Sequence, residues 1–520
     1  MESLTRLVLD KCDLLHVLPK DIGQLTKFGF AEGASLQSLP ESFEHLPKLR
    51  RQELFNCALQ RLPAGFGKLA SLEIFKVGTK EEYDRHGLSE NEWLGANLDI
   101  FGSCALRTLP QSLTLLTRLE ELVLDGCDLR NDPPMGMGNL SSLKVLKVRN
   151  CDQLSYLPSL LTPRMQALAL QAGPACTSAA LAAASDPPFP SLENLEISGC
   201  PRLESLPEGL QMLPKLEHFT LKDCPSMVLV VWSPFPSLPP FPVSLTTISI
   251  SNTFQNVKSL PESFLSLSRL CHLDLHSLRL DEYLIAHSAV TNTPAPARAS
   301  LNLLSSLVHL HILDSYLPAL PGNLDDLGEL KVLSLFKCHC ISSLPPVLYN
   351  LSKLEHLSLD SLPLTHLPDN LGQFTALVKL TLQSCKALQG LPSTLTLPSS
   401  LRLMTVANCP GISSLPDSIS SLSHLTSLEL RSLVGLYHLP SSLALLPSLV
   451  KLSLQGCKWL RALPDGLGSL SCLREVDLGG CAQLTELPQS LQKRMNVIEV
   501  NGRWGRRRGQ REPHQGETVY

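Results

Sequence analysis

The sequence has few aromatic residues, little charge and no long apolar run. Aromatic side chains make up 5% of the 520 residues and charged side chains 18%. The formal net charge is −4 at pH 7, which disfavours nucleic acid as a partner, because a nucleic-acid binder usually carries a strong positive excess. No uninterrupted apolar stretch reaches the roughly 18 residues of a membrane-spanning helix. The first 15 residues also lack the apolar core of a secretory signal, so a membrane partner is not expected.

The sequence also lacks the short motifs that carry catalysis or cofactor binding. It contains no phosphate-binding loop, dinucleotide-binding glycine pattern, zinc-protease motif or hydrolase nucleophile elbow. No pair of cysteines has zinc-site spacing, and we interpret the cluster Cys338-His339-Cys340 as structural. We therefore expect no enzyme, no cofactor, no metal and no small-molecule substrate.

Leucine, proline and cysteine are instead plentiful, and they recur in one pattern. The template LxxLxLxxCxxLxxLPxxLxxL fits residues 4–25 and again residues 449–470. A repeat of this length is the signature of a solenoid. The predicted repeats open at positions 4, 25, 49, 72, 95, 119, 143, 165, 192, 216, 245, 270, 307, 330, 354, 377, 401, 425, 449 and 473.

The template predicts the structure of each repeat. Alternating leucines in LxLxx indicate a short strand that buries its leucines on one face. One repeat is too small to bury them alone, so neighbours must stack and their strands become parallel. Proline in the LP step cannot donate to a sheet, so it belongs to the return path, where we expect 3₁₀ turns or very short helices.

The domain organisation follows from this pattern. Residues 1–500 are predicted to form one solenoid of about 20 repeats, and residues 501–520 a disordered basic tail, with a nuclear signal as the alternative. We expect residues 78–94 to be a degenerate return segment and residues 281–300 a surface loop. The proline-rich residues 227–242 are a convex-side loop or a docking motif. Leu4 opens the first repeat without a preceding cap, which suggests a piece of a longer protein.

Cysteine occupies the same place in eleven repeats. We expect these residues to be buried free thiols at the corner where the strand turns, with the S–H group serving the adjoining backbone. They are Cys12, Cys57, Cys127, Cys151, Cys200, Cys224, Cys338, Cys385, Cys409, Cys457 and Cys481.

Repeats such as SGCPRLESLPEGL (residues 198–210) and LQGCKWLRALPDGL (residues 454–467) carry a family resemblance. They resemble the leucine-rich-repeat region of plant intracellular nucleotide-binding resistance proteins, through the cysteine and the LP step after it. They are also similar to plant Ras-group leucine-rich-repeat proteins. The resemblance implies an α/β solenoid, a horseshoe with a parallel β-sheet on the concave face and short 3₁₀ or helical turns on the convex face.

Function must then lie on the exposed face of the strands, at positions two, four and six after each opening leucine. If residues 281–300 bulge out, the repeats at 270 and 307 become neighbours. His272 would then stack beside His309, and Asp274 beside His311. This cluster is a partner-binding region, a metal site or a solvated polar face without a special role.

The same positions define the whole candidate binding face. We expect Phe336 and Arg431 to be the main anchors, because aromatic and arginine side chains dominate protein interfaces. The candidate residues are His272, Asp274, His276, His309, His311, Asp314, Phe336, His356, Asp360, Lys379, Glu429, Arg431, Lys451, Glu475 and Asp477.

Two functions compete. The resemblance to resistance proteins implies a ligand-sensing region of a plant-type intracellular immune receptor, whereas periodicity alone implies only protein binding. The alternative is a free-standing intracellular scaffold of the Ras-group type that assembles a signalling complex. Either function predicts a cytoplasmic protein, with the nucleus as the alternative location, and a protein partner on the concave face.

Overall fold

The computed structural model describes residues 36–46, 49–55, 57–78, 105–130, 136–157, 187–207, 209–227, 241–253, 267–277, 306–316, 327–368, 370–391 and 396–501. Shorter pieces, among them 8–9 and 30–32, are described as well. The chain divides into two compact units, Met1–Leu307 and Val308–Tyr520, and each unit is a stack of repeats.

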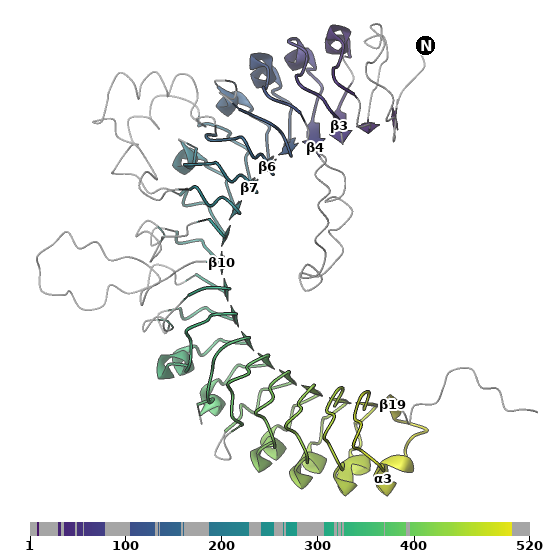
Figure 1. The fold of residues 1–520 in the computed structure, drawn as a ribbon. Helices are drawn as coiled ribbons and strands as arrows, with labels where there is room; N and C mark the ends of the chain where they lie inside the picture. Colours follow the sequence, from purple (N-terminus) through teal and green to yellow (C-terminus); the bar gives the residue numbers. More distant parts are fainter. Residues whose placement is uncertain are drawn as a thin grey trace, which may run out of the picture. The chain divides into compact units, whose positions relative to one another are not determined.

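In the first unit, parallel strands pair one after another in chain order (Figure 1). They are β1 (Val8–Leu9), β2 (Phe30–Glu32), β3 (Arg51–Phe55), β4 (Ile74–Gly78), β5 (Glu121–Asp125), β6 (Val145–Arg149), β7 (Asn194–Ser198), β8 (His218–Lys222), β9 (Thr247–Ser251) and β10 (His272–His276).

The second unit repeats the arrangement, and its strands also pair in parallel in chain order. They are β11 (His309–Leu313), β12 (Val332–Phe336), β13 (His356–Asp360), β14 (Lys379–Gln383), β15 (Leu403–Ala407), β16 (Ser427–Arg431), β17 (Lys451–Ser453), β18 (Glu475–Asp477) and β19 (Glu499–Asn501).

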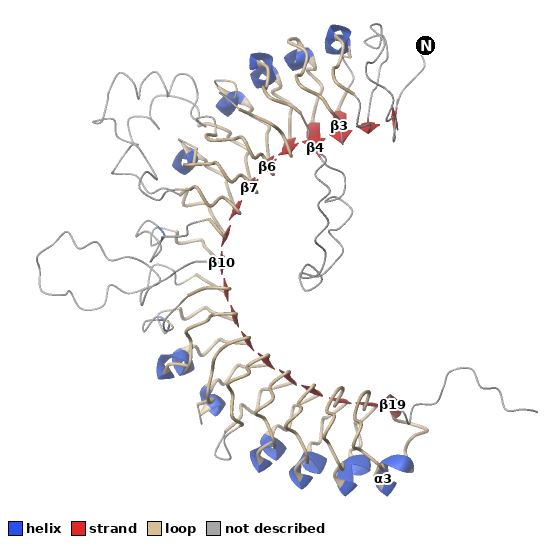
Figure 2. Cartoon of the chain, viewed as in Figure 1, coloured by secondary structure: helices blue, strands red, loops and turns tan. Residues whose placement is uncertain are grey.

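Short 3₁₀ turns lie in the return path of many of the described repeats, on the side away from the sheet (Figure 2). In the first unit they are η2 (Glu41–His45), η3 (Phe66–Lys68), η5 (Gln111–Leu115), η6 (Met137–Asn139) and η8 (Leu210–Met212). In the second they are η13 (Pro346–Asn350), η14 (Leu371–Gln373), η15 (Asp417–Ser421), η16 (Ser441–Leu445), η17 (Asp465–Ser469) and the short helix α3 (Gln489–Gln492). The predicted solenoid, with a parallel sheet on one side and 3₁₀ turns on the other, is confirmed.

The template leucines form the core between the sheet and the turns. In the repeat that opens at 425, Leu425, Leu428 and Leu430 have no exposed surface, and the leucines of the neighbouring repeats are buried in the same way. The predicted inward direction of the LxxLxL residues is therefore confirmed. Phenylalanine replaces leucine in places and forms ring contacts between repeats, such as Phe66 with Phe75, 4.9 Å between ring centroids.

The proline of the LP step begins the 3₁₀ turn. Pro416 and Pro440 stand at the N-caps of η15 and η16 in extended conformation, with ψ near 149° and 146°. The carbonyl oxygen of each proline accepts a hydrogen bond from the N–H three residues later, in Ile419 and Leu443. Since proline lacks an N–H and prefers this φ, it suits the first corner of the turn and explains the high proline count.

The residue directly before the cysteine position adopts a left-handed conformation in repeat after repeat, with φ between 45° and 77°. Its N–H donates to the carbonyl at the end of the following strand, for example from Asn150 to Ser198 at 2.8 Å and from Ser384 to Ala407 at 2.8 Å. This corner was not predicted. Its residues are Gly126, Asn150, Gly199, Asp223, Asn252, Ser277, Asp314, Lys337, Ser361, Ser384, Asn408, Ser432, Gly456 and Gly480.

The cysteine at the corner of the repeat is buried, and its thiol donates a hydrogen bond to the backbone, as predicted. The thiol of Cys457 donates to the carbonyl oxygen of Leu430 in the preceding repeat, 3.1 Å away, and Cys481 donates to Leu454 at 3.1 Å. Where a serine replaces the cysteine, its hydroxyl donates to a carbonyl of the same repeat instead. Ser315 donates to the carbonyl of Leu313 at 2.9 Å. A small donor is thus what this corner requires, and the described template cysteines are all buried and free.

The repeats predicted to open at positions 95 and 165 add no strand to the sheet between the strands before and after them. β4 pairs directly with β5, through Ile74 and Glu121, so the strand expected after position 95 is wrong. Residues 105–118 complete the repeat that begins with β4, since the N–H of Arg107 bonds the carbonyl of Gln60 on the return path of β3. The predicted opening at position 95 is a glycine, which offers no side chain to a core. The predicted return segment 78–94 lies outside the described residues apart from Gly78.

The second correction concerns the repeat expected at position 165. β6 pairs directly with β7, with Val145 opposite Asn194. Residues 165–170 match the strand part of the template, but neither a cysteine corner nor an LP step follows at the expected spacing. A strand without that corner and return path cannot complete a stackable repeat.

Several predictions lie outside the described residues. These are the unit opening at Leu4, the corner residue Cys12, the loop 281–300, most of the proline-rich segment 227–242 and the tail 503–520. Among the helices of the described residues, none has the length and apolar character needed to cross a membrane.

We expect Leu428→Ala to lower the free energy of unfolding by about 2–5 kcal/mol, because it leaves a cavity among stacked leucines. Urea unfolding followed by circular dichroism measures the change. Leu445→Ala is the matched control, because Leu445 is 68% exposed, and it should cost less than about 0.5 kcal/mol. A loss below about 1 kcal/mol for Leu428→Ala would contradict the core assignment.

We expect thiol alkylation to separate two neighbouring cysteines. Burial raises the pKa of Cys338 to about 11, as it does that of Cys457, so little reactive thiolate forms at neutral pH. Cys340 lies two residues away and is exposed. Brief iodoacetamide treatment of the folded protein, followed by peptide mass spectrometry, should label Cys340 and exposed Cys472 but spare Cys338 and Cys457. Equal labelling of Cys338 and Cys340 would show that the corner thiol is accessible, while labelling of all four in urea is the control.

Candidate functional site

The candidate site is the exposed face of the strands in each unit, which we call the concave face. Alternate side chains of each strand point away from the core, so this face carries three rows, at the first, third and fifth residue of each five-residue strand. In the second unit the register confirms the middle row. Its members are Ser334, Ser358, Thr381, Thr405, Glu429, Ser453 and Asp477, each opposite the next.

Small hydroxyl side chains fill one half of this middle row. Ser334, Ser358, Thr381 and Thr405 are half-buried on successive strands. Neighbouring strands in a sheet lie roughly 4.8 Å apart, so these hydroxyls repeat at that spacing. This part of the concave face is a strip of small, half-buried hydroxyl groups.

Glu429 is the centre of the other half. Its carboxylate accepts a hydrogen bond from Thr405 at 3.5 Å and forms an ion pair with Arg431 at 3.1 Å. Ser453, which lies opposite Glu429 on the next strand, is only 1% exposed. The hydroxyl of Ser453 and the Nε of Arg431 are both buried without a hydrogen-bond partner in this part of the described chain.

The first row carries charges of both signs. Lys451 and Glu475 lie opposite each other on β17 and β18 and form an ion pair of 3.2 Å. His356 and Lys379 lie opposite each other on β13 and β14, and both are exposed. In the middle row, Asp477 is the last residue of β18, and its carboxylate accepts a hydrogen bond from the N–H of Gly479 at 2.9 Å.

Phe336 lies in the last row, between Leu313 on β11 and Asp360 on β13. The ammonium group of Lys337 lies 5.1 Å from the centre of its ring. Burial raises the pKa of Asp360, although a hydrogen bond from Ser361 at 2.8 Å and the charge of Lys337 partly offset that effect. Phe336 is therefore a half-buried apolar contact point beside polar and charged groups.

Asp314 occupies the left-handed corner after β11 instead of a strand row. Its carboxylate pairs with the imidazole of His339 at 3.1 Å. The His339 ring in turn lies 5.0 Å from the ring of Tyr316. His339 and Tyr316 were not predicted, since they follow the strands and the outward-position rule stops at the strand end.

The histidines of the predicted cluster are divided between the two units. His272, Asp274 and His276 lie on β10 in the first unit, where His276 shares a 3.0 Å hydrogen bond with Ser251. His309 and His311 lie on β11 in the second. The expected pairing of His272 with His309 and of Asp274 with His311 joins the units and stays a prediction. No group of His, Cys, Asp or Glu within the described ranges has the geometry to hold a metal ion.

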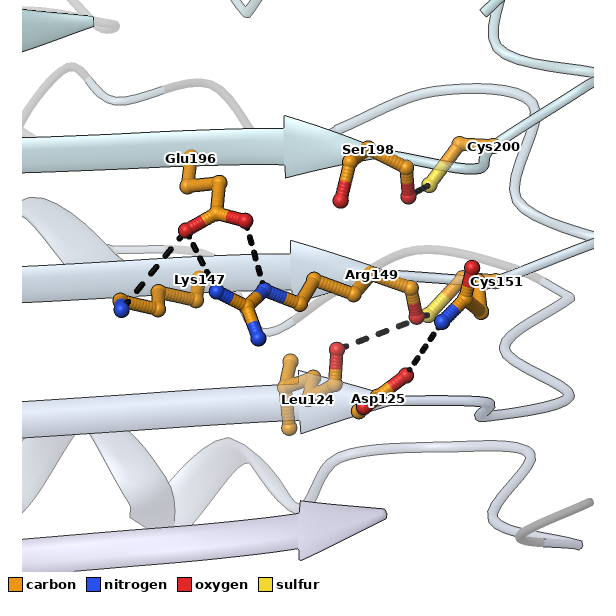
Figure 3. Close-up of polar contacts among 9 residues, drawn as sticks. Leu124, Asp125, Lys147, Arg149, Cys151, Glu196, Ser198 and Cys200 are labelled. Atoms are coloured by element: carbon orange, nitrogen blue, oxygen red, sulfur yellow. Dashed lines mark hydrogen bonds and ion pairs between the residues drawn. The ribbon is translucent and has the colours of Figure 1, made fainter. Parts of the chain in front are cut away.

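The first unit has a charged network that the sequence analysis missed (Figure 3). The guanidinium of Arg149 holds Glu196 through two hydrogen bonds of 2.6 and 2.8 Å, and Lys147 lies 3.7 Å from the same carboxylate. Burial alone would raise the pKa of Glu196. The hydrogen bond and charge of Arg149, with the charges of Lys147 and Lys222, outweigh burial and lower that pKa.

These residues obey the outward-position rule. Lys147, Arg149 and Glu196 stand at the fourth, sixth and fourth positions after their opening leucines, so the same rule applied to the first half would have found them. Arg149 is only 7% exposed, because the neighbouring strands cover its stem. This network fixes one carboxylate between two cations on the concave face of the first unit.

Comparison with known proteins supports the fold and gives a distant relationship. No family model matches the chain. A leucine-rich-repeat protein of Leptospira interrogans has a similar structure, with a TM-score of 0.52 and 20% identity over 96% of both chains. At that identity the likeness bears on the fold alone.

Two curated proteins of Arabidopsis thaliana share part of the sequence. A probable disease resistance protein is 29% identical over 223 residues, which is 40% of this chain and 11% of the relative. The protein SUPPRESSOR OF npr1-1, CONSTITUTIVE 1 is 26% identical over 269 residues, 48% of this chain and 18% of the relative. The chain thus spans between a tenth and a fifth of the length of these relatives. It is a leucine-rich-repeat protein with distant similarity to the leucine-rich-repeat regions of plant disease-resistance proteins.

Proposed function

We propose that this chain recognises a protein partner through its concave face, and that it is the ligand-sensing and autoregulatory region of a plant-type intracellular immune receptor. The sequence similarity to two Arabidopsis proteins, one of them a probable disease resistance protein, supports the receptor role. A cytoplasmic location, with the nucleus as the alternative, belongs to the same proposal. So does the division into a solenoid over 1–500 and a basic tail over 501–520.

One observation carries the binding proposal. Buried polar atoms are almost always hydrogen-bonded, and those that are not call for an explanation. On the concave face of the second unit, two buried groups are unsatisfied near Glu429. They are the Nε of Arg431, two residues later on the same strand, and the hydroxyl of Ser453, opposite Glu429 on the next strand. A partner that displaces Glu429 from Arg431, or that adds an acceptor beside it, would supply the missing bonds.

The groups around this point suit a protein ligand. Arg431 provides a planar donor that matches a carboxylate or a backbone carbonyl, and the adjacent hydroxyl strip admits a main chain. The pair of Arg431 with Glu429 is partly exposed, with side-chain exposures of 42% and 21%. Such exposed pairs contribute about 0–1 kcal/mol, so a partner can replace one of them at little cost.

A free-standing scaffold of the Ras-group type is the second candidate, and it uses the same face. The LP step of the template favours it as much as it favours the receptor. Messenger RNA that includes the region upstream of Met1 discriminates between them. An in-frame phosphate-binding loop supports the receptor, and a stop codon followed by an untranslated leader supports the scaffold.

We expect Arg431→Ala to abolish or greatly weaken partner capture, because it removes the main donor of the concave face. The test compares proteins cross-linked to wild type and variant in plant cell extract and identified by quantitative mass spectrometry. Truncation of a central interface arginine typically costs about 2 kcal/mol or more, which is roughly a thirtyfold loss of affinity.

Arg402→Ala is the matched control, since Arg402 is exposed on β15's flank, outside the three rows of the concave face. It should leave the set of captured proteins unchanged. If Arg431→Ala captures the same proteins in the same amounts as wild type, the concave face of the second unit is not the recognition surface.

A further inference from the structure

A second exposed surface lies on the flank of the second unit, outside the concave face. It is formed by the segments that lead from β16 to η16 and from β17 to η17, in two adjacent repeats. We call it the lateral patch. It consists of Val434, Tyr437, Lys458, Trp459 and Arg461, all of them exposed.

The apolar members of the patch are among the exposed large apolar residues of the described chain. Val434 is 40% exposed, Tyr437 41% and Trp459 48%. The leucines between and beside them, Leu436 and Leu460, are completely buried. The leucines of these repeats are therefore fully buried, while the neighbouring aromatic residues stay partly exposed.

The patch is a continuous surface across the two repeats. The N–H of Arg461 donates to the carbonyl of Tyr437 at 3.1 Å, and its guanidinium carbon lies 6.0 Å from the centre of the Tyr437 ring. The position equivalent to Trp459 in the preceding repeat is Gly435, which has no side chain to cover the indole. A Cβ there would lie 2.3 Å from the carbonyl oxygen of Pro410, so the backbone packing keeps this place empty of side chains.

Two cations border the rings, and no acid neutralises them. Within the described residues of the second unit, neither Lys458 nor Arg461 forms an ion pair. Glu486 occupies the flank of the following repeat and pairs with neither. This differs from the concave face, where Lys451 and Arg431 are each paired with a glutamate.

We propose that the lateral patch is a second binding site, and that its occupant is an acidic protein segment with an aromatic or aliphatic side chain beside its carboxylates. The unpaired cations supply the charge complementarity. The guanidinium of Arg461 can hold a carboxylate while its face stays against Tyr437. Trp459 and Val434 give the apolar side chain a surface to cover, and tryptophan, tyrosine and arginine are the residue types that dominate binding energies.

A single-stranded nucleic acid is the other polymer that stacks on aromatic rings beside cations. It needs a track of positive charge along its backbone, with a stacking ring for successive bases. The lateral patch has only two cations. In the two repeats that flank the patch, the position of Arg461 is occupied by Ser413 and Thr485, which carry neither a charge nor a ring. The chemistry of the patch therefore favours a short acidic peptide.

The test measures binding of a fluorescein-labelled peptide, made of aspartates around one central phenylalanine, to the full chain by fluorescence anisotropy. We expect saturable binding that weakens with added salt. Trp459→Ala and Arg461→Ala should each weaken it by at least about fivefold, the loss of about 1 kcal/mol that separates contributing interface residues from neutral ones. The same peptide with lysines for aspartates should not bind.

The variants of this test lie outside the concave face, and they have a matched control. Arg402→Ala, a loss of one exposed cation outside both surfaces, should bind the peptide as tightly as wild type. The proposal for the lateral patch can therefore be refuted without refuting the proposal for the concave face, and the reverse is also true. The proposal is overturned if the peptide does not bind at millimolar concentration or if Trp459→Ala and Arg461→Ala bind it like wild type. It is also overturned if an oligothymidylate binds more tightly than the peptide.

Discussion

From β5 to β18, the left-handed residue just before the cysteine position determines how one repeat packs on the next. Its N–H reaches the last carbonyl of the following strand, as from Lys337 to Asp360 at 2.9 Å, and so extends the parallel ladder by one bond beyond the strand. It also turns the chain by a sharp corner, which puts the next side chain, the cysteine position, back into the core. Without this turn the outgoing segment would continue along the sheet and the leucines of the return path would point to solvent.

This corner restricts which residues are favourable at its position, yet the sequence pattern did not reveal it. Left-handed φ values favour glycine, asparagine and aspartate, and these residues do occupy many of the corners. Lys337 and several serines occupy others, at a cost of about 1–2 kcal/mol each relative to glycine. Because the residue type varies, no single letter marks the corner in the sequence. The following cysteine marks it instead, since a small donor is needed for the carbonyl of the preceding strand.

The inward residues could be predicted because buried leucines recur at a fixed spacing, which stays the same although the outward residues differ from repeat to repeat. The limits of that reasoning appear at positions 95 and 165. Residues 165–170 have alternating apolar side chains, but the sequence after them lacks the cysteine corner and the LP step of the template. The opening of the other predicted repeat is Gly95, which has no side chain for a core, while Leu106 and Leu109 are buried in the repeat that begins with β4. Spacing identifies the parts of a repeat, whereas hydrogen bonds between repeats decide which parts belong together.

The outward residues are not constrained by burial, and their contacts depend on which residues lie opposite them on neighbouring strands. This explains why the candidate site was only partly predictable. Position relative to the opening leucine tells which side chains reach the concave face, and it placed Glu429, Arg431 and Lys451 correctly in their rows. It does not tell which charges cancel. Neighbouring strands bring Arg149 onto Glu196 and Lys451 onto Glu475, so much of the formal charge on this face is already compensated within the sheet.

Charge that is compensated along the ladder offers a partner little electrostatic gain, because each new contact replaces an existing one. What remains attractive is the donor that the ladder leaves unsatisfied, as at Arg431 and Ser453, and the cation that has no partner, as at Lys458 and Arg461. The concave face and the lateral patch therefore suit different ligands. In the proposed function, the concave face selects a partner that completes its unsatisfied hydrogen bonds, and this gives specificity. In the further proposal, the lateral patch combines open aromatic surface with unpaired positive charge, and this gives affinity for acidic, partly apolar segments.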